Sequence, residues 1–198
     1  MMSLRLTYTF FSPFYDWFVG PVFHVARGRS LAALPRSGGQ VLLNGVGTGL
    51  DLPLLPAERR YIGLDLTRAM LGHCGARAAD LDFSSVQGDS LRLPFGDQSF
   101  DHAVLHLILA VVSEPARALA ETARVVRHGG GILIFDKFLA RGKRAPLRRL
   151  LSPLAARIAT RLDVVFEDVL ERVVGLEVIS DRPSVGRGWF RLIELRRL

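Results

Sequence analysis

Short apolar runs alternate with helical patterns through the middle of this chain, and this alternation constrains its fold more than any other feature. The runs expected to be strands are QVLLNG (40–45), RYIGLDL (60–66), FSSVQGD (83–89), DHAVLHLIL (101–109) and GGILIFD (130–136). Strands separated by helices form parallel sheets with helices on both faces. Two later runs, LEVISDRP and GWFRLIELRRL, favour an antiparallel C-terminal edge. The sequence therefore predicts a doubly wound, mainly parallel seven-stranded α/β sheet.

The connecting segments have the composition of helices. Residues 114–130 begin with Pro115 near the expected start of a helix and carry Ala, Leu and Val at helical spacing, so we expect the helix to stop at Gly129–Gly131. The segments 67–81 and 166–175 have similar patterns. The region between the first two strands is interrupted by prolines, and it can hold only a short helix.

The length of 198 residues fits one domain, because no linker or repeat divides it. We expect a single domain over 1–198 with four parts: an aromatic helical cap (1–36), a cofactor-binding core (40–136), basic amphipathic helices (137–162), and a C-terminal helix with strands (163–198). Cys74 is the only cysteine, so an intramolecular disulfide and a Cys-built zinc site are excluded. No signal peptide and no run of ~18 apolar residues is present, which predicts a cytoplasmic protein.

The first strand runs into the turn GVGTG, with Gly45, Gly47 and Gly49 at alternate positions. A dinucleotide fingerprint would need glycine at position 50, which is Leu50, and the Gly-Lys-Ser/Thr of a phosphate-binding loop is absent. Backbone N–H groups in such a turn suit a ligand with a ribose and an amino-acid-like tail. Asp65 ends the next strand, where a carboxylate can accept hydrogen bonds from both ribose hydroxyls, although an Asp there is as often a helix cap.

Four motifs, GVGTG, YIGLDLTRAML, GDSLRLPFGDQSFDHAVL and EPARALAETARVVRHGGGILIFD, occur in this order between residues 40 and 136. With them the chain resembles the class I S-adenosylmethionine-dependent methyltransferases, of the type that includes quinone-biosynthesis and phospholipid N-methyltransferases. The resemblance implies a Rossmann-like fold and S-adenosylmethionine as cofactor. It also implies a cofactor site in which the turn glycines lie under the methionine part, Asp65 holds the ribose, and Asp89 and Ser90 meet the adenine. Leu66 is a further cofactor-binding candidate.

One position departs from the family pattern. Members of the family usually have Asp or Glu two residues before the first glycine, where this chain has Leu43. Asn44 follows it, but side chains alternate along a strand, so Asn44 should point to the opposite face. Losing one charge-assisted hydrogen bond costs roughly 1.5–3 kcal/mol, which corresponds to about ten- to a hundredfold weaker cofactor binding. A binding protein without catalytic activity on this fold is therefore one hypothesis.

Two residues at strand ends are candidates for catalysis. His106 follows the fourth strand and Asp136 the fifth, at the carboxyl ends where open α/β sheets bind ligands. A base is needed in methyl transfer only when the acceptor arrives protonated. The Asn/Asp-Pro-Pro-Tyr motif for methylating amide or base nitrogens is absent. The alternative for His106 is a buried histidine with a structural hydrogen bond.

The segments before and after the cofactor-binding core suggest which kind of molecule accepts the methyl group. Eight of the seventeen aromatic residues lie between Tyr8 and Phe23. Such a stripe is usually core, but resembling enzymes close an N-terminal helix carrying a tyrosine over the cofactor, which makes Tyr8 and Tyr15 candidates. Residues 137–162 contain eight basic and no acidic residues, among them Arg144, Arg148 and Arg149. An apolar stripe flanked by arginines is typical of a helix lying on anionic lipid.

A net charge of +7 also allows RNA as the anion, but Phe138 is the only aromatic residue in the basic segment on which a base could stack. The balance favours an anionic phospholipid surface, with the protein peripheral on the inner membrane. The leading hypothesis is a methyltransferase that acts on a lipid-like acceptor. The acceptor that the overall pattern favours is the amine of phosphatidylethanolamine. The second hypothesis is methylation of a quinone or another small molecule.

Overall fold

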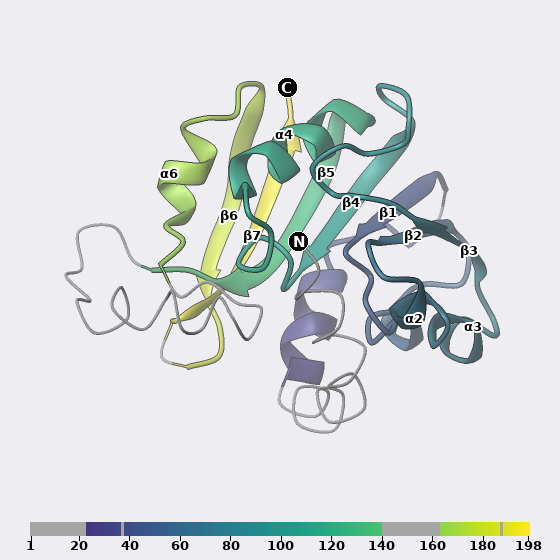
Figure 1. Ribbon diagram of the computed structural model, residues 1–198. Coiled ribbons are helices and arrows are strands. Elements are labelled where there is room, and N and C mark those ends of the chain that lie inside the picture. The colour runs from purple at the N-terminus through teal and green to yellow at the C-terminus, as the bar shows by residue number, and fades with distance from the viewer. Residues whose placement is uncertain (1–22, 37, 140–162, 187) are drawn as a thin grey trace.

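The described residues of the computed structural model, 23–36, 38–139, 163–186 and 188–198, form a seven-stranded sheet in the order β3-β2-β1-β4-β5-β7-β6 (Figure 1). The pairs among the first five strands are parallel, and β7 is antiparallel to both β5 and β6. The strands are β1 Gln40–Asn44, β2 Arg60–Asp65, β3 Asp82–Gln87, β4 Phe100–His106, β5 Val126–Lys137, β6 Leu176–Pro183 and β7 Phe190–Arg197. The predicted fold class is confirmed.

The C-terminal strands pair in an arrangement that the sequence pattern does not reveal. The last strand, β7, lies inside the sheet, and β6 forms the edge. The reason is burial: β7 contributes the buried residues Ile193 and Leu195, whereas no residue of β6 is fully buried. The more apolar strand therefore takes the inner position, where both of its sides are hydrogen-bonded.

Helix α4, Pro115–Val125, starts at the predicted proline but ends before the glycines, so the predicted stop at Gly129–Gly131 is wrong. Those glycines lie within β5. Val126 pairs with Phe100, and the register between β4 and β5 then shifts. A Cβ on Gly130 would collide with the carbonyl oxygen of Asp101, so the strand needs glycine there.

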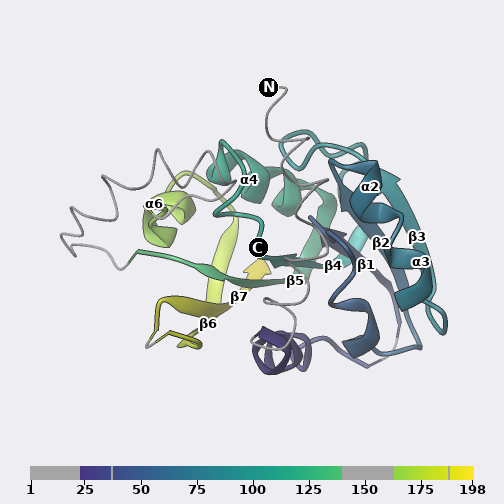
Figure 2. The ribbon, with the colours of Figure 1, turned by 60° about the horizontal axis from the view of Figure 1, so that its bottom comes forward.

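Helices cover both faces of the sheet (Figure 2). The other helices are α2 Arg68–Leu71, α3 Cys74–Arg77, α6 Phe166–Leu170, the 3-10 turn η1 Leu52–Leu54, and a helix over residues 23–31 that we call the N-terminal helix. Figure 2 shows the N-terminal helix and α4 on opposite sides of the sheet. The short η1 agrees with the proline-interrupted segment of the sequence.

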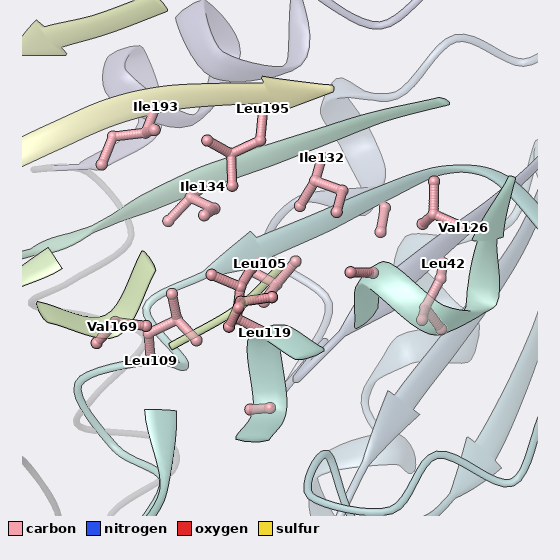
Figure 3. Close-up of a cluster of buried hydrophobic side chains, with 14 of the residues drawn as sticks. Leu42, Leu105, Leu109, Leu119, Val126, Ile132, Ile134, Val169, Ile193 and Leu195 are labelled. Carbon is pink, nitrogen blue, oxygen red and sulfur yellow. The ribbon is translucent and has the colours of Figure 1, made fainter. Parts of the chain in front are cut away.

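Each face has its own hydrophobic core, and residues of β1 alternate between them. Leu42 packs in the cluster on the α4 face, with Leu105, Leu119 and Ile134 (Figure 3). Val41 and Leu43 pack on the other face, in a cluster that includes Leu31 of the N-terminal helix, Leu52 and Val104. We call the two sides the α4 face and the N-terminal-helix face.

Candidate functional site

The glycine turn leaves β1 in a conformation that favours glycine at all three predicted positions. The φ angles of Gly45, Gly47 and Gly49 are 78°, 57° and 84°, in the left-handed region. A Cβ on Gly45 would lie 2.7 Å from the side chain of Ile108, and one on Gly49 would lie 2.6 Å from that of Leu52. At Gly47 a Cβ would meet nothing within 4 Å. The turn is packed at both ends and open at its centre.

Asp65, at the end of β2, lies directly beside the open centre of this turn. Its carboxylate accepts hydrogen bonds from the backbone N–H of Gly47 at 3.0 Å and of Thr67 at 2.9 Å. Burial raises the pKa of Asp65, and this effect is larger than that of the backbone hydrogen bonds, which lower the pKa. The next residue, Leu66, is 44% exposed. The structure therefore brings together Gly47, Asp65 and Leu66, as the sequence predicts.

The loop after β3 is tied to the α4 face by a chain of hydrogen bonds. The Ser90 hydroxyl donates to Oδ1 of Asn44 at 2.6 Å, and Nδ2 of Asn44 donates to the Thr122 hydroxyl at 3.0 Å. Thr122 in turn donates to the Ala118 carbonyl. Ser90 is thus buried with its hydroxyl facing inward, while Asp89 is exposed and its carboxylate accepts from the nearby backbone N–H of Leu91. Contacts of Asp89 and Ser90 with adenine stay a prediction.

Asn44 points away from the face of Leu43, which confirms the expectation from strand alternation. Leu43 is 1% exposed and packs with Leu31, Leu52 and Val104. The position where the family usually carries an acidic side chain is therefore part of the core on the N-terminal-helix face.

A charged cluster lies on that same face, at the end of β4. His106 Nδ1 is 2.8 Å from Oδ1 of Asp51, and His106 Nε2 is 3.0 Å from the Ser30 hydroxyl. Arg27 Nη1 donates to the same Asp51 oxygen at 2.7 Å. All four side chains are buried. Burial alone would raise the pKa of Asp51, but the charges and hydrogen bonds of His106 and Arg27 hold it well below its usual range.

The backbone immediately after His106 is strained. Leu107 has a φ of 60°, which is unusual for a bulky residue, and its N–H donates to the Phe135 carbonyl at 2.8 Å. Such strain costs of order 1–3 kcal/mol and clusters at functional sites. The Phe135 ring meets the His106 ring edge to face, with centroids 5.7 Å apart. His106 is therefore held from three sides.

Asp136 lies on the opposite face of the sheet, because it follows Phe135, which contacts His106. Its carboxylate accepts from the backbone N–H of Ala110 at 3.0 Å and of Lys137 at 2.8 Å. Burial raises the pKa of Asp136 to about 6. The two candidate catalytic residues do not converge. A catalytic role for Asp136 stays a prediction, and its visible role is to fix the turn after β4.

Five residues of the predicted site, Tyr8, Tyr15, Arg144, Arg148 and Arg149, lie outside the described residues, as does most of the basic segment 137–162. Conversely, sequence reasoning missed Arg27, Ser30 and Asp51. The only signal for Asp51 was its place directly after the glycine turn. None of the helices in the described residues has the length and apolarity that a membrane span requires. The same residues contain no cluster of three metal-ligating side chains.

Comparison with known proteins places this geometry in a family. Residues 42–134 match the methyltransferase domain family. A phosphatidylethanolamine N-methyltransferase of Cereibacter sphaeroides is 35% identical over 190 residues, covering 92% of both chains. The chain belongs to the S-adenosylmethionine-dependent methyltransferases. Its cofactor is S-adenosylmethionine, and the hypothesis of a binding protein without catalytic activity is set aside.

Two further comparisons show a partial sequence similarity and a shared fold. A demethylmenaquinone methyltransferase of Renibacterium salmoninarum is 37% identical over 108 residues, covering 54% of this chain and 44% of that relative. The solved structure of a SAM-dependent methyltransferase from Thermotoga maritima superposes with a TM-score of 0.74 and 19% identity, covering 98% of this chain and 99% of that one. The second similarity shows the shared fold.

Proposed function

We propose that this methyltransferase transfers a methyl group from S-adenosylmethionine to the amine of a phosphatidylethanolamine-like lipid at a membrane surface. The observation that carries the proposal is the end-to-end similarity to the phosphatidylethanolamine N-methyltransferase, over 92% of both chains. The similarity to the quinone methyltransferase covers only 54% of this chain. A match of this length extends beyond the core 40–136 into the flanking segments, where we expect the acceptor to bind.

The residues at the glycine turn fit the cofactor. The open backbone at Gly47 leaves room for the methionine part, and the Asp65 carboxylate beside it suits the two ribose hydroxyls. The exposed Leu66 offers an apolar surface, and the exposed Asp89 can accept from the exocyclic amine of adenine. The cofactor, when bound, supplies a methyl group on a positively charged sulfur. We assign the buried Leu43 no contact with it.

The acceptor amine explains why a base is present. An alkylamine is largely an ammonium ion at neutral pH and has no lone pair for attack until it loses a proton. His106 lies at the carboxyl end of β4 and is the candidate base. The His106 side chain is only 1% exposed, so little water reaches it, and this strengthens its electrostatic interactions.

The lipid part of the proposal draws on the sequence. Eight basic and no acidic residues in 137–162 would attract an anionic surface, by about 1 kcal/mol for each basic residue near the lipid. Binding would place the protein peripherally on the inner membrane, next to its substrate.

The test is transfer of labelled methyl from S-adenosylmethionine to vesicles of phosphatidylethanolamine and phosphatidylglycerol. We expect labelled N-methylated lipid from the wild type and at least about a twentyfold loss with Asp65→Ala. The matched control is Asp82→Ala, at the start of neighbouring β3, whose exposed carboxylate makes only a 3.8 Å contact with Arg60. Absence of labelled lipid with the wild type, or equal transfer by Asp65→Ala, would contradict the proposal.

A further inference from the structure

The charged cluster on the N-terminal-helix face joins three separate parts of the chain. Arg27 and Ser30 come from the N-terminal helix, Asp51 from the segment after the glycine turn, and His106 from the end of β4. The His106 side chain is 1% exposed and that of Asp51 is 7% exposed. Buried charged groups cost several kcal/mol of desolvation, and an ion pair often fails to recover this cost. The cluster therefore calls for a reason other than stability.

The cluster is also incompletely satisfied. Nε of Arg27 is buried and has no hydrogen-bond partner among the described residues. A network built only to stabilise the fold would be expected to satisfy each buried donor. In contrast, the polar chain on the α4 face, Ser90 to Asn44 to Thr122 to Ala118, has a partner at each step.

The hydrogen bonds fix where the protons of His106 lie. Asp51 is a charged carboxylate and can only accept, so Nδ1 of His106 must carry the proton between them. In neutral His106 the lone pair is then on Nε2, where the Ser30 hydroxyl donates to it at 3.0 Å. A basic nitrogen is thus held in one orientation with a single neutral side chain in front of it.

The position of this nitrogen relates it to the cofactor turn. Leu43 of β1 pairs with Val104 of β4, and Gly45 and His106 each follow two residues later. The Ile108 side chain, two residues after His106, lies against Gly45, and the strained Leu107 connects the two positions. His106 therefore lies at the same end of the sheet as the turn that would hold the methionine part of the cofactor.

We propose that Asp51 is a positioning residue for methyl transfer: with Arg27 it holds His106 as the Nδ1–H tautomer, and the acceptor displaces the Ser30 hydroxyl from Nε2. His106 is the catalytic residue, and Asp51 acts through it. The inference rests on the proposed function in one respect, the protonated amine of the acceptor.

The chemical step balances without a further reactant. Nε2 of His106 takes one proton from the acceptor ammonium, which leaves a neutral amine and an imidazolium stabilised by Asp51. The amine lone pair forms a bond to the methyl carbon as the carbon–sulfur bond breaks. The electron pair of that bond stays on sulfur, which becomes a neutral thioether. The acceptor nitrogen gains the methyl group and the positive charge.

The first test needs no substitution. In ¹⁵N-histidine spectra of the wild-type protein near neutral pH, His106 is assigned by the signal missing from His106→Gln. We expect the neutral ring of His106 to carry its proton on Nδ1. A proton on Nε2 of the neutral ring, or a ring that carries protons on both nitrogens at the pH of methyl transfer, would overturn the proposal, and this result is independent of the identity of the acceptor.

The second test compares Asp51→Asn with Asp101→Asn. An amide at position 51 can donate to Nδ1, which forces the proton to Nε2, and such a tautomer error in a histidine–aspartate pair costs up to about 10⁴ in kcat. We expect at least a thirtyfold loss of kcat, with the dissociation constant of S-adenosylhomocysteine within threefold of wild type. Asp101 is the matched control, because it also binds an arginine, Arg127, and a backbone N–H, but at the amino end of the sheet.

Three outcomes separate the two proposals. If the wild type methylates phosphatidylethanolamine and Asp51→Asn keeps its kcat, the positioning role is wrong and the proposed function stands. If Asp51→Asn loses kcat and cofactor affinity together, the cluster acts on the fold, and the positioning role is wrong. If the wild type does not methylate this lipid, the proposed function fails, while the tautomer measurement still decides the geometry.

Discussion

The two faces of the sheet hold different polar groups at the carboxyl ends of two neighbouring strands, β4 and β1. On the N-terminal-helix face, Arg27, Asp51 and His106 form a buried charged cluster in which Nε of Arg27 has no partner among the described residues. On the α4 face, Asn44 links Ser90 to Thr122 through neutral hydrogen bonds. The neutral chain fixes the position of a loop, whereas the charged cluster is the one to which we assign proton transfer. Under this proposal, neighbouring strands of one sheet support chemistry on one face and architecture on the other.

The largest effect is expected from His106→Ala. Removing a general base typically costs 10²–10⁴ in rate, so we expect kcat for lipid methylation to fall at least about a hundredfold. Cofactor affinity should change less than threefold, since the variant leaves the turn intact. Steady-state kinetics with calorimetric binding of S-adenosylhomocysteine measures both. If the variant keeps its kcat, His106 is not the base, and the N-terminal-helix face has no catalytic role that the α4 face lacks.

The next effect is a pH dependence of stability from Asp136. Burial raises the pKa of Asp136 to about 6 in the folded state, above the ordinary 3.8 of an aspartate, so the folded state holds a proton that the unfolded state has released between these pH values. This contribution to stability is present below about pH 4 and is lost as the pH rises through 6. The stability of the wild type relative to Asp136→Asn should therefore fall by about 2–3 kcal/mol from pH 4 to pH 7.

Urea unfolding of both proteins at several pH values measures this difference, and the other titrating groups cancel between them. A constant difference across the range would show that Asp136 is not a protonated buried carboxyl group, and the α4 face would then hold a charge as well.

A smaller effect is expected from Asn44→Leu. The substitution removes the partner of Ser90 and one partner of Thr122, which should cost about 2 kcal/mol of stability. Because Asn44 acts on position and not on chemistry, kcat at saturating cofactor should stay within threefold of wild type, while cofactor affinity falls. Chemical denaturation and the kinetic assay together test this. A loss of kcat at saturating cofactor would contradict the division between the faces.

The smallest effect on the fold is expected from Gly47→Ala. The residue has a φ of 57°, where a Cβ costs about 1 kcal/mol, but no neighbouring atom lies within 4 Å of the added carbon. The protein should stay folded and lose affinity for S-adenosylhomocysteine, because the methyl group enters the open centre of the turn. Thermal unfolding and calorimetry provide the two measurements. Unchanged affinity would place the cofactor elsewhere.

Local patterns were sufficient to predict much of this structure. The apolar runs located the first five strands, and alternation along β1 predicted that Leu43 and Asn44 would point to opposite faces. The sequence also placed Asp65 at the carboxyl end of the second strand, where it lies beside the glycine turn and accepts from the Gly47 N–H. Each of these inferences depends on the geometry of one strand or on parallel strands ending at one edge.

The rest depends on contacts between distant parts of the chain. His106 meets Asp51 across 55 positions and Ser30 across 76, and only the packing of the N-terminal helix brings them together. The inner position of β7 likewise depends on which strand buries more apolar surface in the finished sheet. A single sequence contains no periodic signal for such contacts.

A competition assay between the two candidate acceptors tests whether the enzyme methylates the lipid amine. Vesicles would contain phosphatidylethanolamine and demethylmenaquinone in equal amounts, and mass spectrometry would follow the methyl group from labelled S-adenosylmethionine. We expect the amount of label on the lipid amine to be at least tenfold above that on the quinone. With His106→Ala the labelled lipid should be lost. Label on the quinone alone would contradict the proposed function.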